Sequence, residues 1–135
     1  MEELTIKKLK PLPERNVEKD LEWLCDSFGI IRERDKEKTG FKIFKILLKS
    51  TKEGDSLRIN EITKKIKISR TTVVHHLRYM EECGVIVEKN RNYELRMNSL
   101  HEMVDEIKRD ILRSFDEIRQ IAKDIDEDLG IKFRK

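Results

Sequence analysis

The stretch that decides the fold is Ile68–Arg96, with the sequence ISRTTVVHHLRYMEECGVIVEKNRNYELR. Ser69 is a favoured N-cap residue, and Gly84 is the type of residue that commonly follows a helix end in the left-handed conformation. One apolar stripe recurs between them at helical spacing, formed by Val73, Leu77 and Met80. The sequence therefore predicts a helix of about four turns over residues 69–83.

The opposite face of this helix carries no acidic side chain between Arg70 and Met80. A solvated helix surface usually pairs Lys with Glu, whereas this face has side chains that can meet phosphates and base edges. The best candidates for contact with base edges or the nearby backbone are Arg70, Thr71, His75 and Arg78. His76 lies one position before Leu77, so we expect it to turn toward the domain instead.

Two short apolar runs follow Gly84, around Val85–Val87 and Tyr93–Met97. The four residues Lys89, Asn90, Arg91 and Asn92 separate them and have the composition of a turn. The pattern predicts a β-hairpin with a basic tip over 88–93. Such a hairpin is suited to contact a phosphate backbone or a minor groove.

The residues before this stretch complete a helix-turn-helix. An amphipathic helix is expected over about 40–52, and 57–59 could form a short strand. Asn60 is expected to cap a two-turn helix that turns Lys64 and Lys65 outward. A tight turn at residues 67–68 then leads directly to Ser69, which is helix-turn-helix spacing. We expect phosphate contacts from Lys64, Lys65, Ser69 and Thr72.

The positive charge of the chain lies in the same region. The 135 residues carry a formal net charge of +3. Residues 41–98 contain 13 Lys or Arg against 7 Asp or Glu, a net +6, whereas residues 1–40 have a net −1 and residues 99–135 a net −2. This distribution is typical of a nucleic-acid-binding surface.

Two amphipathic segments flank the basic region. The first is a helix expected over 16–34, after an extended arm at 1–15, and a charged linker at 32–40 is read as a solvated loop. The second is one long helix over 99–129, followed by a basic tail at 130–135. Both have coiled-coil spacing, which predicts dimerisation. The expected interface residues are Leu21, Leu24, Phe28, Leu100, Val104, Ile107, Ile111, Ile118, Ile121 and Ile125.

Residues 41–97 resemble the winged helix-turn-helix of archaeal and bacterial transcription regulators, most closely the ArsR type. The residues that carry the resemblance are Ser69, Thr72, Val73, His76, Leu77, Glu82, Cys83, Gly84, Val85, Ile86, Lys89 and Arg91. Lys67 replaces a glycine that is frequent in the turn, and a residue with a Cβ disfavours the left-handed conformation there. The metal-sensing signatures of the family are absent, since no Cys-x-Cys precedes the recognition helix and His101 has no second His at i+3.

These observations predict a mainly helical fold with a small β-hairpin wing, in which a winged helix-turn-helix over 41–98 lies between an N-terminal helix and a long C-terminal dimerisation helix. The predicted function is a homodimeric, sequence-specific regulator of transcription that binds an inverted repeat in double-stranded DNA. We expect no catalysis, cofactor, metal or membrane association. The two separated cysteines favour a reducing cytoplasm. The alternatives are a winged-helix protein-interaction module and a ligand- or metal-responsive repressor.

Overall fold

The computed structural model describes residues 16–131. The predicted arm at 1–15 and the tail residues 132–135 lie outside the described residues. The chain divides into two units, with the boundary between Met103 and Val104.

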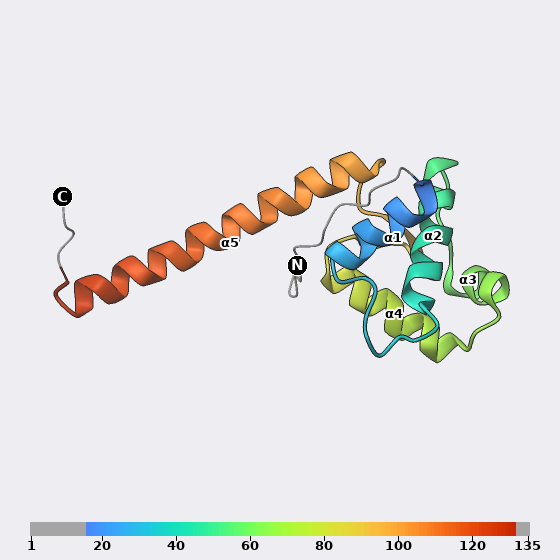
Figure 1. Cartoon of the computed structure of the whole chain (residues 1–135), viewed down its shortest axis with the longest axis horizontal. Helices are drawn as coiled ribbons and strands as arrows, with labels where there is room; N and C mark the ends of the chain where they lie inside the picture. The colour runs from blue at the N-terminus through green and yellow to red at the C-terminus, as the bar shows by residue number, and fades with distance from the viewer. Residues whose placement is uncertain (1–15, 132–135) are drawn as a thin grey trace. The chain divides into compact units, whose positions relative to one another are not determined.

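The described residues form five helices and one two-stranded antiparallel hairpin. Their bounds in chain order are α1 Val17–Ser27, α2 Thr39–Lys52, α3 Ile59–Ile66, α4 Arg70–Glu82, β1 Ile86–Lys89, β2 Asn92–Leu95 and α5 Leu100–Asp128. The first unit contains α1 to α4 and the hairpin. Figure 1 shows α4 along the lower edge of this unit, below α1 and α2. The predicted mainly helical winged helix with a long C-terminal helix is confirmed.

The core of the first unit forms where α4 packs against α2 and α3. Val73, Leu77 and Met80 are each at most 1% exposed, as the predicted stripe requires. Phe44 and Leu47 of α2 are fully buried. Burying a side chain of this size contributes about 1.5 to 3 kcal/mol, so this stripe determines which way α4 faces.

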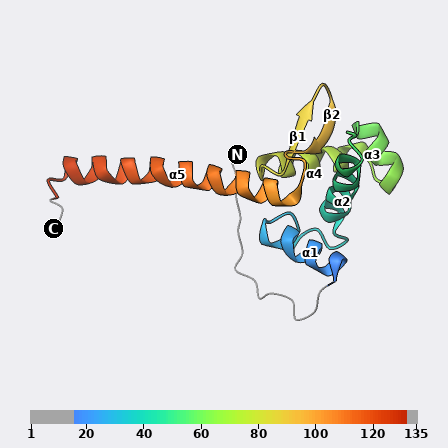
Figure 2. The ribbon, with the colours of Figure 1, turned by 90° about the horizontal axis from the view of Figure 1, so that it is seen from above.

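The hairpin pairs Ile86 with Leu95 at one end and Lys89 with Asn92 at the other. Asn90 and Arg91 both have positive φ, at 52° and 66°, which is the pattern of a two-residue type I′ turn. The turn is therefore shorter than the four residues predicted. Figure 2 shows the hairpin on the side of α4 away from α1.

A single residue of the predicted strand at 57–59 pairs with the hairpin. The Leu57 amide donates to the Tyr93 carbonyl at 2.9 Å, and the Tyr93 amide donates to the Leu57 carbonyl at 2.7 Å. Ile59 instead opens α3. The bridge ties the entry of α3 to the wing, because both backbone groups of Leu57 are used in it.

The start of α3 differs from the prediction. Arg58, not Asn60, occupies the N-cap position, and its backbone N–H donates to Glu61 Oε1 at 3.1 Å. A glutamate three residues after the cap commonly makes this reciprocal bond. Asn60 lies inside the first turn, so its side chain is available to another partner.

Helix α1 is shorter than the predicted 16–34. Asn16 caps it as expected, since its Oδ1 accepts from the Lys19 amide at 3.0 Å. Gly29 has a φ of 75° just after the helix end, so the chain turns there and Ile31 is not helical. Val17, the first residue of α1, is 86% exposed.

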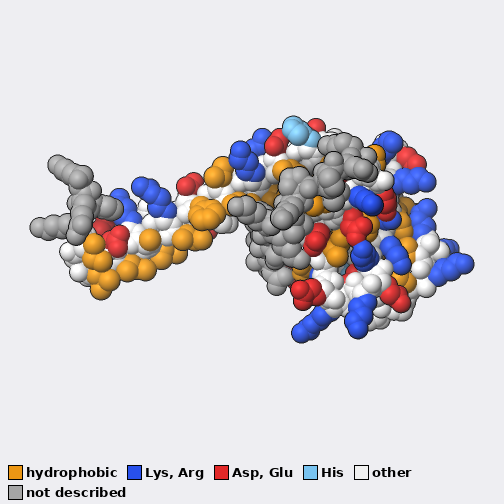
Figure 3. All heavy atoms as spheres, viewed as in Figure 1, with side chains coloured by type: hydrophobic (Ala, Val, Ile, Leu, Met, Phe, Trp, Pro, Cys, Tyr) orange, Lys and Arg blue, Asp and Glu red, His pale blue; other side chains and the backbone are white. Residues whose placement is uncertain are grey.

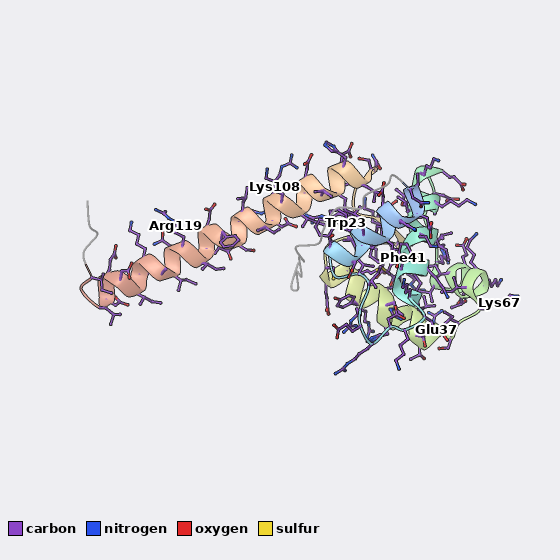
Figure 4. All side chains as sticks on the ribbon, viewed as in Figure 1. Trp23, Glu37, Phe41, Lys67, Lys108 and Arg119 are labelled. Carbon is purple, nitrogen blue, oxygen red and sulfur yellow. The ribbon has the colours of Figure 1, made fainter. Side chains whose placement is uncertain are left out.

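The turn between α3 and α4 contains Lys67 in the left-handed conformation, with φ 52° and ψ 46°. Figure 4 shows Lys67 at the outer end of α3. The turn thus forms with a lysine where a glycine is frequent. An L-residue with a Cβ pays about 1 to 2 kcal/mol for this conformation.

We predict that Lys67→Gly raises the free energy of unfolding by about 0.5 to 1 kcal/mol, because glycine adopts positive φ without steric cost. Lys67→Val should lower it by about 1 to 2 kcal/mol, since a β-branched residue is a poor fit to this region. Urea unfolding followed by circular dichroism measures both. Equal stabilities of the two variants would contradict the left-handed turn.

Candidate nucleic-acid interface

The start of α4 is held by its own side chains. Ser69 Oγ accepts from the Thr72 amide at 3.2 Å and donates to Thr72 Oγ1 at 2.9 Å. The predicted N-cap is confirmed. Both hydroxyl groups therefore stabilise the start of α4. The Thr72 hydroxyl proton is not used in these two bonds, and the Ser69 oxygen can accept a second hydrogen bond.

The outward face of α4 is formed by exposed polar side chains. Thr71, His75 and Arg78 are exposed, and Val74 is half-buried. His76 is buried, as expected, so adjacent histidines face different surroundings. The outward face of the two turns from Arg70 to Arg78 is thus free of negative charge, as the sequence indicated.

A hollow of about 350 Å³ lies where α3, α4 and the hairpin meet. Its lining residues are Arg58, Ile59, Asn60, Arg70, Glu88, Arg91 and Tyr93. Arg70 Nη1 donates to Asn60 Oδ1 at 2.8 Å, which places the Arg70 guanidinium over the first turn of α3. Three guanidinium groups against one carboxylate make this hollow suited to an anion.

Arg58 is a member of this hollow that sequence reasoning missed, because residues 57–59 were read as a strand. The available signal was Glu61, whose spacing from Arg58 is that of a capping box. That spacing predicts a start of α3 at Ile59, directly after Arg58.

The wing residues have local partners. Lys89 Nζ lies 3.4 Å from Glu94 Oε1, an exposed pair of the kind that contributes little to stability. Asn92 Nδ2 donates to the Asn90 carbonyl at 3.0 Å and so supports the turn. Arg91 is exposed at the tip. Lys64 and Lys65 are exposed in the last turn of α3.

One flank of α4 faces the hairpin. Burial raises the pKa of Glu81, and the negative charge of Glu88 raises it further while Arg78 lowers it. Burial also raises the pKa of Tyr93, with the same influence from Glu88 and Arg78. The charges of Arg78 and of Glu88 on β1 therefore act on the same two groups, Glu81 and Tyr93.

The other flank of α4 faces the segment between α1 and α2. Tyr79 Oη donates to the Gly29 carbonyl at 2.7 Å, and the Arg32 guanidinium carbon lies 4.0 Å from the centroid of the Tyr79 ring. A second hollow of about 320 Å³ is lined by Arg32, Arg34, Asp35, His75 and His76. The segment predicted as a solvated linker is therefore anchored to α4.

Asp35 fixes the other end of that segment. Its two carboxylate oxygens accept from the Thr39 and Gly40 amides, at 2.9 and 2.8 Å, and so cap α2. Gly40 also leaves room for its other neighbours, since a Cβ there would lie 3.2 Å from the Ile30 carbonyl oxygen and 3.3 Å from His76 Nδ1. The segment is thus held at both ends.

The cysteines and histidines do not form a metal centre within residues 16–131, where no three His, Cys, Asp or Glu side chains gather as such a site requires. Cys25 and Cys83 are both buried. Burial raises the pKa of the Cys25 thiol to about 12, and nearby Glu22 adds to this. The Cys25 thiol is therefore protonated at neutral pH and a weak nucleophile.

Residues 42–88 match the family model described as "Bacterial regulatory protein, arsR family". This segment is an ArsR-like helix-turn-helix. The match extends from α2 through α4 to β1, so it includes the outward face of α4 and the first strand of the wing. It supports a DNA-binding regulator of transcription.

Neither a curated protein nor a solved structure matches the chain. Among the helices that the structure describes, none has the length and apolar character needed to cross a membrane.

The buried His76 predicts a pH-dependent stability. Burial lowers the pKa of its imidazole below the ordinary 6.5, with further lowering by His75 and Arg32 and an opposing effect of Asp35. The unfolded chain therefore takes up a proton near pH 6.5, whereas the folded chain does so only at lower pH. The contribution of His76 to stability is present above about pH 6.5 and is lost as the pH falls through this window.

Urea unfolding at pH 7.5 and at pH 5.5 should show a larger loss of unfolding free energy for the wild type than for His76→Gln, which cannot titrate. His75→Gln is the matched control, because His75 is exposed on the same helix. An equal loss in the wild type and His76→Gln would contradict the assignment.

Proposed function

We propose that the protein is a homodimeric, sequence-specific regulator of transcription that places α4 in the major groove of double-stranded DNA. The observation that carries this proposal is the outward face of α4, which is exposed and acid-free over two turns and borders a hollow with three arginines. Two copies would read an inverted repeat with half-sites about 34 to 36 Å apart. A regulator of this kind acts at the chromosome, so we assign it to the cytoplasm.

The side chains divide into base readers and phosphate contacts. Thr71, His75 and Arg78 lie on the outward face and are the proposed base readers. Arg70 is held by Asn60 beside Arg58, so we now assign it to a phosphate. The further phosphate contacts come from the exposed lysines of α3, from the α4 cap and from the wing, namely Lys64, Lys65, Ser69, Thr72, Lys89, Asn90, Arg91 and Asn92.

The backbone of the wing supports its role in binding. Arg91 has a φ of 66°, a conformation that favours glycine, and an Asn-Gly pair is the preferred sequence for such a turn. Lys67 is a second basic residue with positive φ on the same helix-turn-helix. Both residues adopt a backbone conformation that a glycine would adopt at lower cost. A basic side chain at such a position is explained if its charge contacts DNA.

The proposed dimer uses α5. Beyond its first two turns this helix has an exposed apolar stripe that includes Phe115, Ile118, Ile121 and Ile125, each between 51% and 63% exposed. Figure 3 shows hydrophobic side chains in a row along one side of α5, and Figure 4 shows Lys108 and Arg119 along another. An uncovered stripe of this length is typical of a coiled-coil interface.

Two of the ten predicted interface residues are buried within the single chain. Phe28 is 8% exposed and Ile107 is 1% exposed. Leu21, Leu24, Leu100, Val104 and Ile111 are half-buried. The proposal depends on Ile118, Ile121 and Ile125, to which Phe115 is now added.

In-vitro selection of random duplex DNA with the purified protein tests the function. We expect enrichment of two similar half-sites in inverted orientation. Arg78→Ala should lower affinity for the selected duplex by about 1 to 3 kcal/mol and relax preference at one position. Lys123→Ala, an exposed change on α5, should bind like the wild type. No enriched sequence, or full affinity and selectivity of Arg78→Ala, would reject the proposed reading face.

The dimer is tested by sedimentation of the wild type and of the double variant Ile118→Asp, Ile121→Asp. The wild type should sediment as a dimer at micromolar concentration and the variant as a monomer, because two carboxylates in the seam cannot be desolvated at low cost. Lys108→Asp with Arg119→Asp introduces the same side chains on the polar side and should remain dimeric. A monomeric wild type, or a dimeric seam variant, would overturn the proposed interface.

A further inference from the structure

An α-helix in a major groove has a phosphate backbone on each side of it. Thr71 and His75 are four residues apart in α4 and therefore lie on the same face of the helix. Both are exposed, so this face points away from the core. Arg78 and Tyr79 are adjacent, so they point about 100° apart, one to each side of that direction. The two flanks of α4 therefore correspond to two different backbones of the bound DNA.

The hairpin occupies the Arg78 side. Glu88 of β1 and Arg78 of α4 both act on the Glu81 carboxyl, since the first raises its pKa and the second lowers it. Arg91 and Arg70 line the hollow on this side. The wing and the start of α4 thus account for contacts with one backbone only.

The segment between α1 and α2 occupies the Tyr79 side. The hollow there joins Arg32 and Arg34 to His75, which is itself on the outward face. Arg32 is half-buried and stacked on Tyr79, which fixes its position, whereas Arg34 is exposed. Cation–π stacking leaves the N–H groups at the edge of a guanidinium free to donate to a phosphate oxygen.

The acidic residues of this segment do not cancel the two arginines in the hollow. Asp35 lines it and is fixed by the backbone amides of α2, so the hollow has two guanidinium groups against one carboxylate. Glu33 and Glu37 are exposed and do not line the hollow. Figure 3 shows Lys and Arg side chains along the lower edge of the first unit, where Figure 1 places α4 and the segment before α2.

We propose that Arg32 and Arg34 form a second phosphate-binding site, which contacts the DNA backbone on the side of α4 away from the wing. This site rests on the proposed function, because it needs α4 in a major groove. It makes the reading unit a clamp in which α4 lies between two sets of arginines. Arg32 and Arg34 set the position and affinity of the helix, whereas the outward face of α4 reads the sequence.

The test uses the full chain and a fluorescein-labelled duplex obtained by the selection described above. Each substitution removes its contact from both protomers of the bound dimer. Arg34→Ala should therefore reduce the slope of log affinity against log salt concentration by about 1.8, and Arg32→Ala with Arg34→Ala by about 3.6. The double variant should bind about tenfold or more weakly at 0.15 M salt. Lys36→Ala, an exposed change in the same segment outside the hollow, is the matched control and should bind like the wild type.

The position of the contact is tested with duplexes that carry one neutral methylphosphonate at a time. The wild type should lose affinity at phosphates on both sides of each half-site. Arg34→Ala should become insensitive on one side, and Arg91→Gly, which changes the wing tip, on the other. Arg34→Ala is decisive because Arg34 is exposed, whereas loss of Arg32 also removes its contact with Tyr79.

The outcomes separate the two proposals. If the wild type binds, Arg91→Gly weakens binding and Arg34→Ala has the wild-type affinity, salt slope and phosphate sensitivity, the second site is overturned and the proposed function stands. If Arg34→Ala and Arg91→Gly lose sensitivity at the same phosphates, the clamp is also overturned. If the wild type selects and binds no duplex, the proposed function fails and the second site fails with it.

Discussion

Burial of one stripe of α4 against α2 is the constraint on which the rest of the first unit depends. Val73, Leu77 and Met80 are almost completely removed from solvent, and rotation of α4 by one residue would expose them. His75 and Arg78 therefore face outward because the core leaves them no other direction. The hairpin follows α4 through Gly84, and the segment before α2 is attached to Tyr79, so both flanking surfaces are positioned by the same helix.

The elements that could be predicted from sequence have local causes. Ser69 and Gly84 mark the ends of α4, and the spacing of Val73, Leu77 and Met80 identifies its buried side, all within 16 consecutive residues. The hairpin was likewise visible because apolar runs are separated by residues that favour turns. The long α5 was predicted to within a residue or so at each end, since nothing in its sequence breaks a helix.

The arginines outside α4 and the wing could not be found in this way. Arg32 lies over Tyr79, and the nearby bond from Tyr79 to Gly29 joins residues 50 positions apart, which periodicity within one helix does not reveal. A run of alternating charges normally indicates solvated backbone, and here tertiary contacts at Tyr79 and α2 override that reading. Arg58 was missed for the opposite reason, since a local signal existed at Glu61 but the apolar neighbours favoured a strand.

The hydrogen bond from Arg70 to Asn60 has a consequence for the thermodynamics of binding. A free arginine side chain loses about 2 kcal/mol of rotamer entropy when it is fixed, and here much of that loss has occurred on folding, before any DNA is present. The guanidinium still has donors left for an anion, because Asn60 accepts from only one of its nitrogens. Asn60 thus lowers the entropic cost of ordering Arg70 in the proposed phosphate contact.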